Sequence, residues 1–127
     1  MMLIKIIMIL AGGGLGAVAR YTLGSQIDKN LNLSFPVGIF FVNLLGCFLI
    51  GLIVSIFENK LIFSENLKIF LIIGFLGSFT TFSTFAFDNY NFMTQKNILL
   101  LFANIFLTNT FGLLMVLIGM KTVKIIN

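Results

Sequence analysis

Four long apolar runs, separated by short polar connectors, dominate the sequence. They cover residues of about 3–23, 37–57, 67–90 and 98–120. At 1.5 Å of rise per residue, a helix of about 20 residues crosses the roughly 30 Å hydrocarbon core of a bilayer. The pattern therefore predicts an all-α membrane protein in which residues 1–127 form a single domain of four transmembrane helices.

Basic residues are divided almost evenly between the two ends of these helices. An even number of spans puts both termini on one side, which carries five basic residues against three on the other. The five are Lys5, Lys60, Lys68, Lys121 and Lys124, and the three are Arg20, Lys29 and Lys96. Because the positive-inside rule orients a chain through such differences, so small an excess specifies the insertion direction weakly. Four helices also enclose little interior, so we expect an antiparallel, dual-topology homodimer.

Composition supports the membrane assignment and excludes several classes of function. Of the 127 residues, 59% are hydrophobic and 9% are charged, against about half and about a quarter in soluble domains. The basic residues stand singly, which argues against a nucleic-acid partner and leaves membrane lipid as the surroundings. The chain has no His, and Asp28, Glu58, Glu65 and Asp88 fall at or beyond the predicted helix ends. We therefore expect no enzyme and no midplane carboxylate of the kind that small proton-coupled exporters need.

The third run mixes glycines, hydroxyls and phenylalanines in a way that a plain membrane anchor does not require. Its central segment, residues 74–85, reads Gly-Phe-Leu-Gly-Ser-Phe-Thr-Thr-Phe-Ser-Thr-Phe. Irregular or polar backbone at membrane depth survives only where protein buries it or water lines it. We therefore expect this helix to be broken near its middle and to face a pore.

Phe82 and Phe85 are the main candidates for lining that pore. They lie one turn apart, among the hydroxyls of Ser83 and Thr84. Bulk that faces lipid or the core is the simpler interpretation in a chain with 16 phenylalanines. Aromatic ring edges are positive, however, and edges turned toward a narrow path could replace water around a small anion.

The other helices hold a few polar positions, each with two interpretations. Arg20 either reaches the membrane interface or faces an aqueous vestibule that concentrates anions. Asn43 is the single amide of the second run, and it either joins helices or offers its NH₂ hydrogens to an anion. Asn104 and Thr108 share one stripe of the fourth helix, with Asn109 as an alternative position.

The glycines of the first run have a spacing typical of closely packed helices. Gly12 and Gly16 form a small-xxx-small pair, which lets two helix backbones approach each other. Close packing is therefore the expected role of these two residues.

Three of the helices carry motifs that resemble the Fluc/CrcB family of small fluoride channels. Residues 74–85 resemble the family's third-helix signature, roughly Gly-Phe-x-Gly-x-x-Thr-Thr-Phe-Ser-Thr-Phe. Residues 12–20 resemble its Gly-Gly-x-x-Gly-Ala-x-x-Arg pattern, and residues 36–46 resemble its Pro-x-Gly-Thr-x-x-x-Asn-x-x-Gly element. The chain departs from the family at Ile39, where Thr is usual, and at Cys47, where Ser is common.

The resemblance implies a set of site residues. The implied fluoride path consists of Asn43, Phe82, Phe85, Ser83 and Thr84, with Asn104 and Thr108 on the fourth helix and Arg20 in the vestibule. It also implies a structural Na⁺ on the dimer axis, held by the backbone carbonyl oxygens of Gly77 and Thr80 from each subunit. Carbonyl oxygens suit such a hard cation, whereas an ordinary glycine kink sealed by side chains or water would need none.

The function implied by the resemblance is passive, fluoride-selective export across the cell (inner) membrane. Hydrogen fluoride enters acidified cells as a neutral molecule and dissociates inside, so a selective exit for the trapped anion relieves toxicity without energy coupling. A small four-helix proton-coupled exporter is one alternative, and its flux would depend on a proton gradient. A non-transporting membrane assembly protein is another, and it would give no ion flux in liposomes.

Overall fold

The computed structural model describes residues 1–59 and 64–126, and all the regular structure within them is helical. Helix α1 spans Met2–Leu31, α2 spans Val37–Asn59 and α6 spans Ile98–Ile126. The third span is composite: α3 (Glu65–Lys68), the π-helix η1 (Ile69–Leu76), α4 (Gly77–Phe79) and α5 (Phe82–Thr94) follow end to end. Within the described residues, four helices are long and apolar enough to cross a membrane, which confirms the predicted four-span, all-α architecture.

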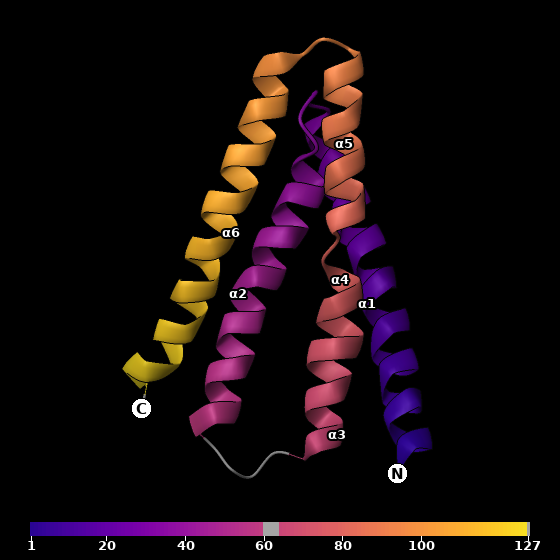
Figure 1. Cartoon of the computed structure of the whole chain (residues 1–127), viewed down its shortest axis with the longest axis vertical. Coiled ribbons are helices and arrows are strands. Elements are labelled where there is room, and N and C mark those ends of the chain that lie inside the picture. Colours follow the sequence, from indigo (N-terminus) through magenta and orange to yellow (C-terminus); the bar gives the residue numbers. More distant parts are fainter. Residues whose placement is uncertain (60–63, 127) are drawn as a thin grey trace.

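The four spans form two packed pairs (Figure 1). Helix α2 packs along α6, and α1 packs along η1 and α4. Contacts of α1 with α2, and of α5 with α6, join the pairs. Both termini lie at the same end of the bundle, at the bottom of Figure 1. Lys60, one of the basic residues counted at that end, lies outside the described residues.

Helix α1 is longer than the predicted 3–23 because its polar continuation is also helical. The helix ends where Asn32 adopts the left-handed conformation, at φ 45° and ψ 46°, and its N–H donates to the Asp28 carbonyl oxygen. Asp28 also accepts a 2.7 Å hydrogen bond through Oδ1 from the N–H of Gly38, in the first turn of α2. An acidic side chain at a helix start satisfies a free N–H and suits the helix dipole, so Asp28 ties the end of α1 to the start of α2.

Glycines allow the helix backbones within each pair to approach closely. A Cβ added at Gly12 or Gly16 would collide with the backbone carbonyl of Phe70 or Phe75, which confirms close packing at this small-xxx-small pair. Gly51 and Gly119 likewise allow α2 and α6 to pack closely. An added Cβ would collide with the Val116 carbonyl at Gly51 and with the Phe48 carbonyl at Gly119. The buried apolar centre, formed by Val42, Leu76 and Phe79, lies between α2 and the middle of the third span.

Candidate functional site

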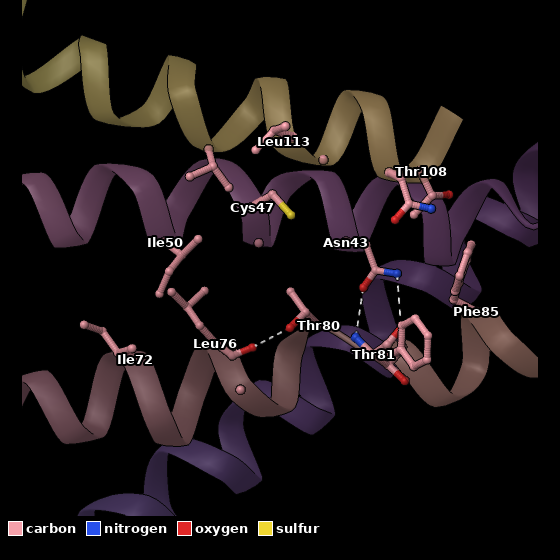
Figure 2. Close-up of a pocket in the computed structure, with 16 residues that line it drawn as sticks. Asn43, Cys47, Ile50, Ile72, Leu76, Thr80, Thr81, Phe85, Thr108 and Leu113 are labelled. Carbon is pink, nitrogen blue, oxygen red and sulfur yellow. Dashed lines mark hydrogen bonds between the residues drawn. The ribbon is translucent and has the colours of Figure 1, made fainter. Parts of the chain in front are cut away.

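A groove of about 540 Å³ lies between α2, α6 and the middle of the third span. The predicted site residues that line it are Asn43, Gly77, Thr80, Phe82, Phe85 and Thr108. Figure 2 shows that the side chains of Asn43, Thr80, Phe85 and Thr108 come from three different spans. Cys47 and Asn109 also line the groove, whereas Ser83, Thr84, Asn104 and Arg20 do not. Residues far apart in the sequence therefore meet at one place inside the apolar bundle.

The backbone of the third span loses helical geometry at two threonines beside this groove. Thr80 (φ −82°, ψ 154°) and Thr81 (φ −146°, ψ 119°) are extended, and they separate α4 from α5. Gly77 has helical dihedral angles, φ −61° and ψ −28°. The extended residues beside the groove are thus the threonines rather than the glycine.

Side chains hold the two threonines in place. Asn43 reaches from α2 to the backbone of Thr81: its Nδ2 donates to the Thr81 carbonyl oxygen at 3.2 Å, and its Oδ1 accepts from the Thr81 N–H at 2.9 Å (Figure 2). The Thr81 Oγ1 accepts from the Thr84 N–H at 3.2 Å and so caps the start of α5. The Thr80 hydroxyl donates to the Leu76 carbonyl oxygen at 3.0 Å. The N–H and C=O of Thr81 and the N–H of Thr84, which the interrupted helix leaves without helical partners, are therefore satisfied by side chains, as burial in an apolar bundle favours.

The same bonds change the environment of two carbonyl oxygens. In a continuous α-helix the N–H of Thr81 would bond to the Gly77 oxygen, and the N–H of Thr84 would bond to the Thr80 oxygen. Here these two donors bond instead to the Asn43 Oδ1 and the Thr81 Oγ1. Both carbonyls consequently lose the donor that a regular helix provides. Carbonyl oxygens are ligands that suit a hard cation.

Asn43 performs the first of the two roles that the sequence left open, because it joins two spans. The side chain is buried, at 9% exposure, and its two hydrogen bonds to Thr81 join α2 to the third span. Nδ2 carries two hydrogens, and only one of them is needed for the Thr81 carbonyl. The second can serve an acceptor in the groove that Asn43 lines.

The two candidate phenylalanines differ in exposure. Phe85 is buried, with 8% of its surface exposed, whereas Phe82 is 78% exposed in the single chain. Their ring centroids are 5.6 Å apart, with the planes inclined by 46°. Both rings line the groove, so they form a continuous aromatic wall that begins inside the bundle and ends on its surface.

The hydroxyls of Ser83 and Thr84 take part in the cap of α5. The Ser83 Oγ lies 3.2 Å from the Thr81 Oγ1, and the Thr81 Oγ1 donates to the Thr84 Oγ1 at 3.1 Å. Neither residue lines the groove. In this single chain their hydroxyls therefore support the geometry of Thr81.

Asn104 belongs to a polar chain that runs behind the groove. It is buried at 2% exposure, and its Nδ2 donates to the Asn89 Oδ1 at 2.9 Å. The groove-lining Thr108 donates through Oγ1 to the Asn104 Oδ1 at 3.2 Å. Asn89 was not a predicted site residue, because nothing in its local sequence distinguishes it from neighbouring polar positions. Asn109 lines the groove itself, and its Nδ2 donates to the Ile105 carbonyl oxygen at 2.6 Å.

None of the charged residues that the structure describes lines the groove. Arg20 is partly exposed on α1 and has no acidic partner within the described part of the chain. Asp88 corrects the prediction that every acidic residue falls at or beyond a helix end. It lies more than a turn before the end of α5 at Thr94, because that helix continues past the predicted boundary at residue 90. Its Oδ2 is buried and accepts no hydrogen bond from the described residues.

Comparison with known proteins confirms the resemblance seen in the motifs. The family described as CrcB-like protein, Camphor Resistance (CrcB), matches residues 7–120. A protein of Dehalococcoides mccartyi is 42% identical over 115 residues, which cover 91% of this chain and 88% of the relative. One from Clostridium perfringens is 40% identical over 115 residues (91% and 90%), and one from Nitrosococcus oceani is 38% identical over 117 residues (92% and 93%). All three carry the name fluoride-specific ion channel FluC. The chain therefore belongs to the CrcB-like protein family.

Proposed function

We propose that this protein is a fluoride-selective ion channel that lets cytoplasmic fluoride leave the cell passively and so relieves fluoride toxicity. The observation that carries the proposal is the groove, where two phenylalanine rings and a buried amide meet beside the irregular backbone of the third span. The names of relatives about 40% identical to this chain support the choice of anion. As a multi-pass membrane protein it would act in the cell (inner) membrane.

The chemistry of the groove suits a small anion. The positive edges of the Phe82 and Phe85 rings and the second Nδ2 hydrogen of Asn43 can replace water around fluoride. None of these groups carries a full positive charge. An ion that is bound by partial charges alone can enter and still leave, which conduction requires. Arg20, outside the groove, would raise the concentration of anions in a vestibule.

We also propose that two copies assemble as an antiparallel homodimer. The near-even division of basic residues supports dual insertion. Phe82, which is 78% exposed in the single chain, would then be covered by the second copy. Such a dimer would bring the Gly77 and Thr80 carbonyls of both subunits together and could hold a structural Na⁺. The ion would supply positive charge that stabilises these oxygens and links the subunits.

Fluoride efflux from liposomes tests the proposed function. We expect purified protein to release fluoride but not chloride, at a rate that a protonophore does not lower. Asp88 is the feature that favours the alternative of a proton-coupled exporter, because such exporters use a carboxylate within the membrane. Fluoride movement only in the presence of a proton gradient would establish the exporter instead. Protein that inserts and assembles but releases neither ion would establish the non-transporting alternative.

The sodium proposal has its own test. We expect replacement of Na⁺ by a large organic cation during purification and assay to lower both the thermal stability of the dimer and the fluoride flux. Addition of Na⁺ should restore both, since each unpaired carbonyl in hydrocarbon costs several kcal/mol. Stability and flux that are unchanged after rigorous removal of Na⁺ would contradict a structural ion.

A further inference from the structure

A chain of three polar side chains leads from the groove to α5. Thr108, which lines the groove, donates through Oγ1 to the Asn104 Oδ1 at 3.2 Å. Asn104 in turn donates through Nδ2 to the Asn89 Oδ1 at 2.9 Å. Asn104 is 2% exposed, so its amide depends on these neighbours rather than on water for hydrogen bonds.

The direction of these bonds gives Thr108 the wrong polarity for an anion. A hydroxyl has one hydrogen and two lone pairs. The hydrogen of Thr108 is used by Asn104, so that Thr108 can offer the groove only lone pairs, which repel fluoride. For Thr108 to donate to an anion, Asn104 must be satisfied in another way.

The two amides permit this change without any movement of the helices. The oxygen and the nitrogen of an amide have nearly the same size and shape, so both side chains can turn over in place. The Asn89 Nδ2 would then donate to the Asn104 Oδ1, and the Asn104 Nδ2 would donate to the Thr108 Oγ1. The hydroxyl hydrogen of Thr108 becomes free for the groove, and every buried amide keeps its partner.

We propose that Asn89 is a positioning residue that lets Thr108 change from an acceptor to a donor as fluoride arrives. The role requires a side chain that can both accept from Asn104 and donate to it, and an amide does both. The inference rests on the proposed fluoride function, which it deepens by adding a residue that acts through Asn104 and does not touch the ion.

The replacement Asn89→Leu separates this role from packing. Leucine has a similar size but no acceptor, and a buried N–H without a partner is avoided more strongly than a buried carbonyl. The Asn104 Nδ2 should therefore turn permanently to Thr108, whose hydroxyl hydrogen then stays free. Fluoride is held more tightly, so the half-saturating fluoride concentration of efflux should fall on the order of tenfold, as expected for one hydrogen bond to a charged group. The maximal rate should fall as well, because release is slower.

Two controls make the result specific. Asn91→Leu removes a similar amide from the same helix, where no hydrogen bond of the side chain links it to Asn104, and it should leave both parameters unchanged. In a Thr108→Val background, which lacks the hydroxyl, Asn89→Leu should have no further effect. An unchanged half-saturating concentration in Asn89→Leu, or the same shift in both backgrounds, would overturn the inference. Absence of fluoride flux from the wild-type protein would instead refute the proposed function.

A second measurement does not depend on the folding of Asn89→Leu. In wild-type protein with labelled asparagine, addition of fluoride should shift the side-chain amide resonances of Asn89 and Asn104, whereas chloride should not. Thr108→Val should abolish the shift. Resonances that are unaffected by fluoride in a protein that conducts it would show that the amides do not turn over.

Discussion

Among single residues, the aromatic wall of the groove gives a direct prediction. Replacement of Phe82 or Phe85 by Ile keeps an apolar side chain but removes the positive ring edge. We expect fluoride efflux to fall at least tenfold, which corresponds to about 1.4 kcal/mol, a loss within the range of aromatic interactions. Efflux from liposomes measures this effect, and size-exclusion chromatography shows whether assembly persists.

Phe87 provides a matched control for these replacements. It lies on the same helix and is 61% exposed, but it does not line the groove. Phe87→Ile should therefore conduct like the wild-type protein. If Phe82→Ile and Phe85→Ile conduct normally too, the two rings serve only as bulk.

Asn43 gives a second prediction for a single side chain. In Asn43→Asp an oxygen replaces the Nδ2 that now lies 3.2 Å from the Thr81 carbonyl oxygen. The carboxylate would repel that carbonyl and, beside the groove, also repel the permeating anion in a medium of low dielectric. We expect fluoride efflux to be abolished, with infrared spectroscopy used to establish that the carboxylate is ionised. Undiminished efflux from Asn43→Asp with an ionised carboxylate would contradict an anion site at this position. Asn43 would then serve only to connect α2 to the third span.

Between helices, the closeness of α1 and η1 can be tested with one methyl group. A Cβ at Gly16 would collide with the backbone carbonyl of Phe75, whereas a Cβ at Gly14 meets nothing within 4 Å. Gly16→Ala should force the helices apart and destabilise the protein by about 1–3 kcal/mol. Gly14→Ala should be neutral, or stabilise by up to about 1 kcal/mol because alanine favours helix. Thermal unfolding in detergent measures both, and equal melting temperatures would show that the contact is not tight.

For the protein as it lies in the membrane, the proposed dual topology predicts how cysteines are labelled. Cys47→Ser provides a background without cysteine, into which Ser34→Cys or Asn66→Cys is introduced at opposite ends of the bundle. If the chain inserts in both directions, each variant should react with an impermeant reagent from both sides of the membrane. A chain of single orientation would react at residue 34 from one side only and at residue 66 from the other side only.

Local patterns in the sequence were enough to predict the number of spans, their helical character and some of the residues that line the groove, among them Asn43, Phe82 and Phe85. Apolar runs of sufficient length must bury their backbone hydrogen bonds as helices in a bilayer. The hydroxyl-rich segment around Phe82 was recognisable for a related reason, since polar groups at membrane depth persist only where protein buries them or water lines them. The close approach at Gly12 and Gly16 could likewise be read from spacing alone.

The pairing of the polar groups, by contrast, followed from the packing of the spans. Asn43 and Thr81 are 38 positions apart in the sequence, and Asn104 and Asn89 are 15 apart. No local pattern specifies such partners, because they depend on which helices meet and at what height. The backbone is extended at Thr80 and Thr81 and helical at Gly77. A helix can open where another span supplies replacement hydrogen bonds, and Asn43 supplies them to Thr81. For the same reason Asn89 escaped notice in the sequence: its role arises from a buried amide on another helix.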